Sequence, residues 1–111
     1  MADQWTIETV MERMPAAFLP EKAGDLAADV QFHLEGEQGG DWIISIRDRT
    51  CTVKRGLTNS ARLTLKAQAS DYLAIVTGKL EAMSAFAQGK IKLKGDLALA
   101  MKLMGFFKLP T

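Results

Sequence analysis

The sequence predicts an α+β fold, with helices packed on one face of a mostly antiparallel sheet. Three observations lead to this fold class. Apolar residues recur at helical spacing near the start of the 111-residue chain, they alternate with polar residues through its middle, and three short apolar helical segments lie in its C-terminal part. Runs of strands joined by short connections, with helices grouped outside them, are typical of α+β proteins.

The first element is a helix from Thr6 to Phe18, and four strands follow it. The helix has one apolar face, formed by Ile7, Val10, Met11 and Met14. Pro20 and Gly24 then mark a loop. Apolar and polar residues alternate over 28–35, 42–47 and 62–67, and a further strand is expected over 50–54. A flexible turn at 36–40 and a tight turn at 48–49 separate the first three strands. Such short connections join antiparallel neighbours.

The C-terminal part combines short helices with a fifth strand. Ser70 is a good N-cap for a helix over 71–77, and a second helix over 80–88 closes at Gly89. Residues 90–94 alternate strictly between lysine and apolar residues, which indicates a strand. Asp96 then caps a last helix that runs from Leu97 to about Phe107.

This last helix is apolar on every face and carries Lys102 as its only charged side chain. At about 16 Å it is too short to span a bilayer. A helix lying on a sheet needs only one apolar stripe, so its second apolar side must meet a ligand, a partner chain, a membrane surface or more core. More core is the commonest of these outcomes, although Met101 and Met104 favour a variable partner because methionine adapts its shape.

Charge and cysteine content exclude several classes. A formal net charge of +1 gives no general attraction to nucleic acid. A single cysteine, Cys51, forms no intrachain disulfide, which fits a reducing cytoplasm. The N-terminus lacks the basic start and apolar run of a signal peptide, and no apolar run approaches the ~20 residues of a membrane span. We therefore expect a cytoplasmic protein.

The residues that suggest chemistry have simpler interpretations. His33, the only histidine, alternates outward with acidic and amide residues, and no Gly-x-Ser-x-Gly motif accompanies it. We expect Cys51 to be a small thiol buried in the core. No cluster of His and Cys has metal-ligand spacing, and the glycines at 36–40 lack the Gly-Lys-Ser/Thr ending of a phosphate loop. We expect no catalytic residue, no metal and no cofactor.

Lysines form a second candidate feature. Lys90, Lys92 and Lys94 share one face of their strand, with Lys79 and Lys102 nearby in sequence. These lysines could bind a carboxylate, a CoA phosphate or an anionic membrane surface. The favoured interpretation is a solvated sheet face whose lysines protect an edge strand.

Several segments, taken together and in order, identify a family resemblance. They are VQFHLEG at 30–36, GDW at 40–42, ARLTL at 61–65, DYL at 71–73, GKL at 78–80 and AQGKIKLKGD at 87–96. The chain resembles the sterol carrier protein type 2 family of lipid-binding domains over roughly residues 7–107. The resemblance implies a five-stranded twisted sheet covered by helices, with a hydrophobic tunnel between the layers.

The resemblance also implies a function. Family members bind fatty acids, fatty acyl-CoA, phospholipids or sterol-like lipids with loose specificity, some as single domains and others attached to peroxisomal enzymes. This chain does not end in a peroxisomal targeting signal. We therefore expect residues 1–111 to form one stand-alone domain of prokaryotic type, a monomer or weak dimer that carries lipid without catalysis and touches membranes at most transiently.

The tunnel wall implied by the resemblance draws on inward-facing residues of strands and helices. The strand residues are Phe32, Trp42, Ile44, Leu63 and Leu65, and the helix residues are Leu73, Val76, Leu80, Met83, Phe86, Met101, Met104 and Phe107. Ligand exchange would require the helices to part, the last one foremost. Two alternatives stay open: an interaction or dimerisation module that uses the C-terminal helix, and an accessory lipid-binding factor in quinone or isoprenoid biosynthesis.

Overall fold

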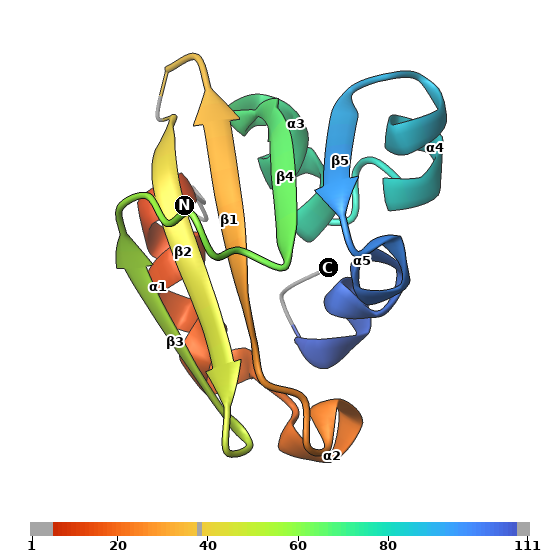
Figure 1. Cartoon of the computed structure of the whole chain (residues 1–111). Coiled ribbons are helices and arrows are strands. Elements are labelled where there is room, and N and C mark those ends of the chain that lie inside the picture. Colours follow the sequence, from red (N-terminus) through yellow and green to blue (C-terminus); the bar gives the residue numbers. More distant parts are fainter. Residues whose placement is uncertain (1–5, 38, 109–111) are drawn as a thin grey trace.

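Five strands form one mixed sheet in the computed structural model, which describes residues 6–37 and 39–108 (Figure 1). The strands lie in the order β3-β2-β1-β4-β5, and their bounds are β1 Ala28–Glu35, β2 Gly40–Arg47, β3 Thr50–Arg55, β4 Leu63–Gln68 and β5 Ile91–Gly95. β1 and β4 run parallel, while the other three neighbouring pairs are antiparallel. The predicted α+β class and mostly antiparallel five-stranded sheet are confirmed.

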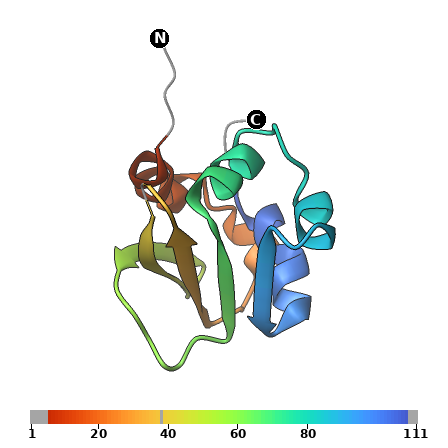
Figure 2. The same ribbon diagram turned by 90° about the horizontal axis from the view of Figure 1, so that it is seen from above.

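The helices gather on one side of this sheet (Figures 1 and 2). They are α1 Ile7–Ala17, α2 Pro20–Ala23, α3 Ala69–Val76, α4 Ala82–Ala87 and α5 Leu97–Leu103, and the 3₁₀ turn η1 Met104–Phe106 follows α5. α1 packs against β3, α3 against β1 and β4, and α5 against β4 and β5. No helix in the described ranges is long and apolar enough to cross a bilayer.

Alternation along the strands explains this one-sided cover. Val30, Phe32 and Leu34 of β1 are buried, and Phe32 lies in register with Trp42 of β2 and Leu65 of β4. Successive side chains of a strand point to opposite faces, so these residues share the face that the helices cover. The apolar stripe of α1 is at most 2% exposed and closes the core over one half of this face.

The opposite face of the sheet is crossed by the connection between β3 and β4. Because β3 lies at one edge and β4 lies beyond β1, residues 56–62 pass in front of β2 and β1 (Figure 1). Gln31, only 2% exposed, holds this connection. Its Nε2 donates to the carbonyl oxygens of Trp42 and Gly56 at 3.0 Å, and its Oε1 accepts from the Thr58 amide at 2.8 Å.

Three local expectations were wrong in detail. A short helix, α2, forms where a loop was expected, since Pro20 occupies its first turn, where proline fits well. α3 starts at Ala69 with Gln68 as N-cap, which leaves Ser70 inside the helix. α5 ends at Leu103 rather than near Phe107, because Phe106 and Phe107 pair with the chain that follows α1: the Leu19 amide donates to the Phe106 carbonyl at 2.7 Å.

The role of Gln31 gives a stability prediction. Gln31→Leu leaves the half-buried Gly56 carbonyl and Thr58 amide without their partner, and a lost hydrogen bond of this kind costs about 0.5–1.5 kcal/mol. We expect the free energy of unfolding in urea to fall by about 1–3 kcal/mol, with Gln88→Leu on the surface changing it by less than about 0.5 kcal/mol. Equal stability of the two variants would show that Gln31 does not hold the crossover.

Candidate ligand-binding pocket

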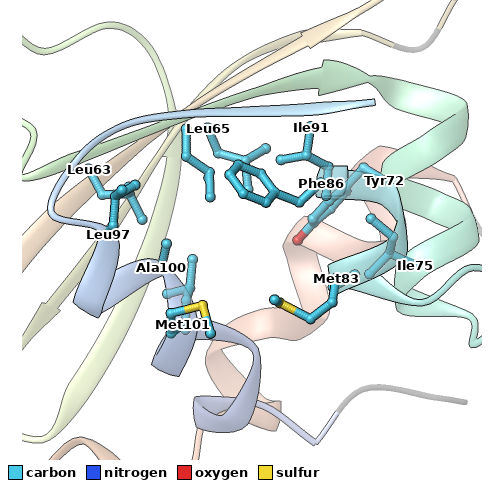
Figure 3. A pocket seen from close by; sticks show the side chains of 13 residues that line it. Leu63, Leu65, Tyr72, Ile75, Met83, Phe86, Ile91, Leu97, Ala100 and Met101 are labelled. Atoms are coloured by element: carbon cyan, nitrogen blue, oxygen red, sulfur yellow. The ribbon is translucent and has the colours of Figure 1, made fainter. Parts of the chain in front are cut away.

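A cavity of about 230 Å³ opens between the β4–β5 half of the sheet and helices α3, α4 and α5 (Figure 3). Leu63, Leu65, Ile91 and Leu93 form its sheet wall. The helices and the chain around them supply the remaining lining residues, which are Tyr72, Ile75, Ala82, Met83, Phe86, Leu97, Ala100, Met101 and Leu103. β4, the edge strand β5 and three short helices therefore surround a space that the main core does not fill.

The wall of this pocket is chemically inert. Its lining residues include no carboxylate and no cationic side chain, and Tyr72 contributes the one hydroxyl. That hydroxyl points to the sulfur of Met14 at 3.7 Å, and the Tyr72 ring packs edge-on against Phe32 with centroids 5.3 Å apart. Burial raises the pKa of Tyr72, so the phenol stays neutral. The site is suited to hold apolar matter rather than to transfer protons.

The mouth of the pocket is apolar and exposed. Met83 and Phe86 of α4 are 55% and 45% exposed, and Leu97 and Met101 of α5 are 52% and 68% exposed. Figure 3 shows Met83 and Met101 pointing toward each other from opposite sides of the opening. In the described part of the chain these four are all but one of the exposed large apolar residues, the other being Leu57.

The structure divides the residues that the sequence suggested for the wall. Five of them line the pocket: Leu63, Leu65, Met83, Phe86 and Met101. Seven lie away from it, in or against the main core: Phe32, Trp42, Ile44, Leu73, Val76, Leu80 and Phe107. The side chain of Met104 lies outside the described part of the structure. Ligand contact by any of these residues stays a prediction, and so does a tunnel, because the cavity seen here is a pocket.

Eight lining residues were missed by sequence reasoning. Two signals were available for some of them. Ile91 and Leu93 alternate with lysines on β5, so they must face inward, and Leu97, Ala100 and Met101 share one face of α5 at spacings of three and four. Tyr72 and Ile75 on α3, and Ala100 and Leu103 on α5, also lie three residues apart, but which of these faces meets the pocket depends on how α3, α4 and α5 pack. The choice of strand residues was too broad because it drew on the whole sheet.

Two other candidate residues lie outside the pocket. The His33 ring Nδ1 lies 2.6 Å from an Asp41 carboxylate oxygen on the outer sheet face, where His33 also lies in register with Lys66. Cys51 is buried on the inner face of β3 at the far half of the sheet, and burial raises the pKa of its thiol to about 11. Neither residue lines the cavity.

α5 is fixed at both ends, whereas α4 is not. At the start of α5, the Asp96 carboxylate accepts from the Leu99 amide and from Arg62 Nε, each at 3.0 Å, and both contacts lower the pKa of Asp96. After η1, the Lys108 amide donates to the Ala17 carbonyl at 2.8 Å. α4 buries only Ala85 and lies between Gly78 and Gly89, which both have positive φ.

Comparison with known proteins places the chain in a family. The model of the SCP-2 sterol transfer family matches residues 7–108. The chain belongs to this family. The resemblance inferred from segments such as those at 30–36 and 87–96 is therefore confirmed, and the family's five-stranded sheet and helices are those described above.

Individual relatives are similar over most of this chain but are much longer. Sterol carrier protein 2 of Homo sapiens is 33% identical over 97 residues, which cover 87% of this chain and 18% of that protein. Hydroxysteroid dehydrogenase-like protein 2 of Bos taurus is 35% identical over 74 residues, 66% of this chain and 18% of that protein. The chain spans less than a fifth of the length of these relatives.

Solved structures agree on the fold of this family member. The crystal structure of Sterol Carrier Protein 2 Like 2 from Aedes aegypti has a TM-score of 0.74 at 30% identity, and the match covers 89% of this chain and 94% of that chain. The sec-alkylsulfatase Pisa1 from Pseudomonas sp. gives a TM-score of 0.83 at 20% identity over 96% of this chain and 17% of that chain. The second match shows the fold alone.

The burial of Cys51 gives a reactivity prediction. A thiol whose pKa is about 11 stays protonated at pH 8, and only the thiolate attacks disulfide reagents. We expect the folded protein to react with such a reagent at least about a hundredfold more slowly than the protein unfolded in urea. Ala98→Cys in a Cys51→Ala background places a thiol on the exposed side of α5 and should react rapidly. Fast labelling of folded wild-type Cys51 would contradict this placement.

Proposed function

We propose that this protein binds the hydrocarbon chain of a lipid in the pocket between β4, β5 and α3–α5 and carries it without changing it chemically. The observation that carries this proposal is the combination of a wall that is apolar except for the Tyr72 hydroxyl with an exposed apolar mouth. A wall of this kind removes methylenes from water, each worth about 0.8 kcal/mol. Contact of this kind has no direction, so broad selectivity among chains follows.

The chemistry of the wall supports one orientation for the ligand. A carboxylate or phosphate buried among Leu63, Leu65 and Ile75 would have no partner, and burying an unpaired charge is costly. The polar head therefore stays at the mouth. Fatty acids, fatty acyl-CoA and phospholipids all suit this arrangement. The Aedes aegypti relative, also solved in a palmitated form, supports an acyl chain as the ligand.

The size of the cavity supports a mouth that opens. Ligand pockets commonly measure roughly 300–1,000 Å³, and the cavity of about 230 Å³ lies below this range. A long acyl chain therefore needs a wall to move. The tethers at both ends of α5 favour α4 as the moving element, in place of the last helix that the sequence suggested. Gly78 and Gly89, which lie on either side of α4, are suited to absorb the change in backbone angles.

A tryptophan inside the pocket tests the binding site. Ala100→Trp fills space that ligand methylenes would occupy, and losing two or three of them should weaken binding of a fluorescent fatty acid at least about tenfold. Ala98→Trp is the matched control, because Ala98 is exposed on the same helix. Ala82→Trp fills the pocket from α4 and should reproduce the effect. Unchanged affinity in both filled variants, with a folded circular dichroism spectrum, would place the ligand elsewhere.

Lipid that co-purifies with the protein tests the function directly. Mass spectrometry of organic extracts from gently purified protein should find a near-stoichiometric acyl lipid in the wild type and less of it in Ala100→Trp. A protein without lipid that forms a concentration-dependent dimer would favour an interaction module instead, and a prenylated lipid would favour a role in quinone or isoprenoid biosynthesis. Location in the cytoplasm remains a prediction from the sequence.

The gate is tested by hydrogen exchange. We expect the amides of 82–88 to exchange at least about tenfold faster than those of 99–103, because α4 has fewer buried contacts. Adding palmitate should slow exchange in 82–88 more than in 99–103. Faster exchange in α5 than in α4 would return the moving role to the last helix.

A further inference from the structure

Tyr72 carries the one polar side-chain group of the pocket wall, and it lies well inside the pocket. Its side chain is only 2% exposed, whereas Met83 and Met101 at the mouth are 55% and 68% exposed. Figure 3 shows the Tyr72 ring extending from α3, with its hydroxyl oxygen at the tip directed toward the space between the sheet and α5. A chain that enters at the mouth would therefore meet this hydroxyl along its length and not beside its head group.

The Tyr72 hydroxyl has a poor partner inside the protein. Its hydrogen-bond contact within the described part of the chain is the sulfur of Met14, 3.7 Å away, and a thioether is a weak acceptor. Buried tyrosine hydroxyls usually find a full partner, because burying one without a partner is costly. A phenylalanine would keep the edge-on packing against Phe32 and would bury no hydroxyl. The oxygen thus lies where stability alone would favour its absence, which is typical of functional sites.

The state of this hydroxyl determines what it can bind. Burial raises the pKa of Tyr72, so the phenol keeps its proton and donates it in a hydrogen bond. A carboxylate is unsuited to this place, because no cationic side chain lines the pocket to balance its charge. A neutral oxygen that accepts a hydrogen bond, such as the oxygen of a hydroxyl or keto group, is suited to it.

We propose that Tyr72 selects lipid chains that carry a hydroxyl or keto oxygen part-way along the hydrocarbon, and that its hydroxyl donates a hydrogen bond to that oxygen. This inference rests on the proposed function and narrows the ligand class of the same pocket. A purely apolar wall would disfavour such a chain, because the oxygen of the chain would lose its hydrogen bonds to water. Tyr72 replaces one of these bonds, and hydrogen bonding discriminates between ligands better than apolar contact does.

Three stearate derivatives of similar bulk test this selection. They carry a hydroxyl, a keto oxygen or a methyl group near the middle of the chain, and displacement of a fluorescent fatty acid measures their affinities. Tyr72→Phe should lower the affinity for the hydroxy and keto chains at least about fivefold, because it removes their hydrogen-bond donor. The affinity for the methyl-branched chain should change by less than about twofold. Equal effects on all three chains would overturn the selection.

The position of the oxygen along the chain gives a matched control. The hydroxyl of α-hydroxystearate lies beside the carboxylate, and the carboxylate stays at the mouth of the pocket. Tyr72→Phe should therefore change the affinity for this ligand by less than about twofold. A loss as large as that for the mid-chain hydroxyl would overturn the placement of the contact inside the pocket.

The hydrogen bond itself can be observed, because Tyr72 is the only tyrosine of the chain. In protein whose tyrosine is isotopically labelled at Cζ, one NMR signal reports on the hydrogen bonding of the phenol oxygen. Stearate with the mid-chain keto group should shift this signal, and the methyl-branched chain should shift it much less. Equal shifts with both chains would show that the hydroxyl does not turn to the ligand, and the proposal would be wrong.

Selection by Tyr72 and lipid binding fail separately in these tests. If all the chains bind, and each binds the wild type and Tyr72→Phe equally, the selection is overturned and the pocket remains a lipid site. If none of the chains binds the wild-type protein, the proposed function is overturned and the selection with it. A folded circular dichroism spectrum and unchanged binding of the methyl-branched chain in Tyr72→Phe would exclude general loss of structure as the cause of weaker binding.

Discussion

The structure depends on how the inner face of the sheet is covered. Five strands present a wide apolar face, and the helices that cover its two halves differ in kind. α1 is a single helix of 11 residues whose apolar stripe is buried almost completely. α3, α4 and α5 have 8, 6 and 7 residues, and α4 buries only Ala85. These three short helices do not cover the β4–β5 half of the sheet completely, and the pocket is the space that remains between them and the sheet.

The connectivity fixes which half has the pocket. β1 is the central strand of the sheet, and β4 joins it in parallel, so the chain must cross the outer face between β3 and β4. Gln31 stabilises that crossing from the middle of β1. After it, α3 returns to the helical side, and α4 and α5 lie on either side of β5 in the sequence. The pocket is thus enclosed by consecutive segments of the chain, and Tyr72 of α3 connects its wall to Met14 of α1.

The fold could be predicted from the sequence further than the site could. Alternation located every strand to within about two residues, because the side-chain period of a strand is visible in a single segment. The pocket is a property of packing. Phe32 and Leu65 are neighbours in register and look alike in the sequence, yet Phe32 is covered by the ring of Tyr72, whereas Leu65 lies in the pocket wall. Only the positions of α4 and α5 distinguish them, and these positions are determined by contacts distant in sequence, such as that of Arg62 with Asp96.

The mouth of the pocket keeps apolar side chains exposed, which lowers solubility without adding to the core. Four large apolar side chains exposed on α4 and α5 contribute little to the core, and polar residues there would improve solubility. Residues of this kind, placed where stability would favour others, are typical of functional sites. The same argument applies to α4 itself: six residues without a side-chain N-cap make a weak helix. Weak attachment and exposed apolar surface are liabilities in a purely structural element, but both would serve the entry of a lipid chain that we propose for this pocket.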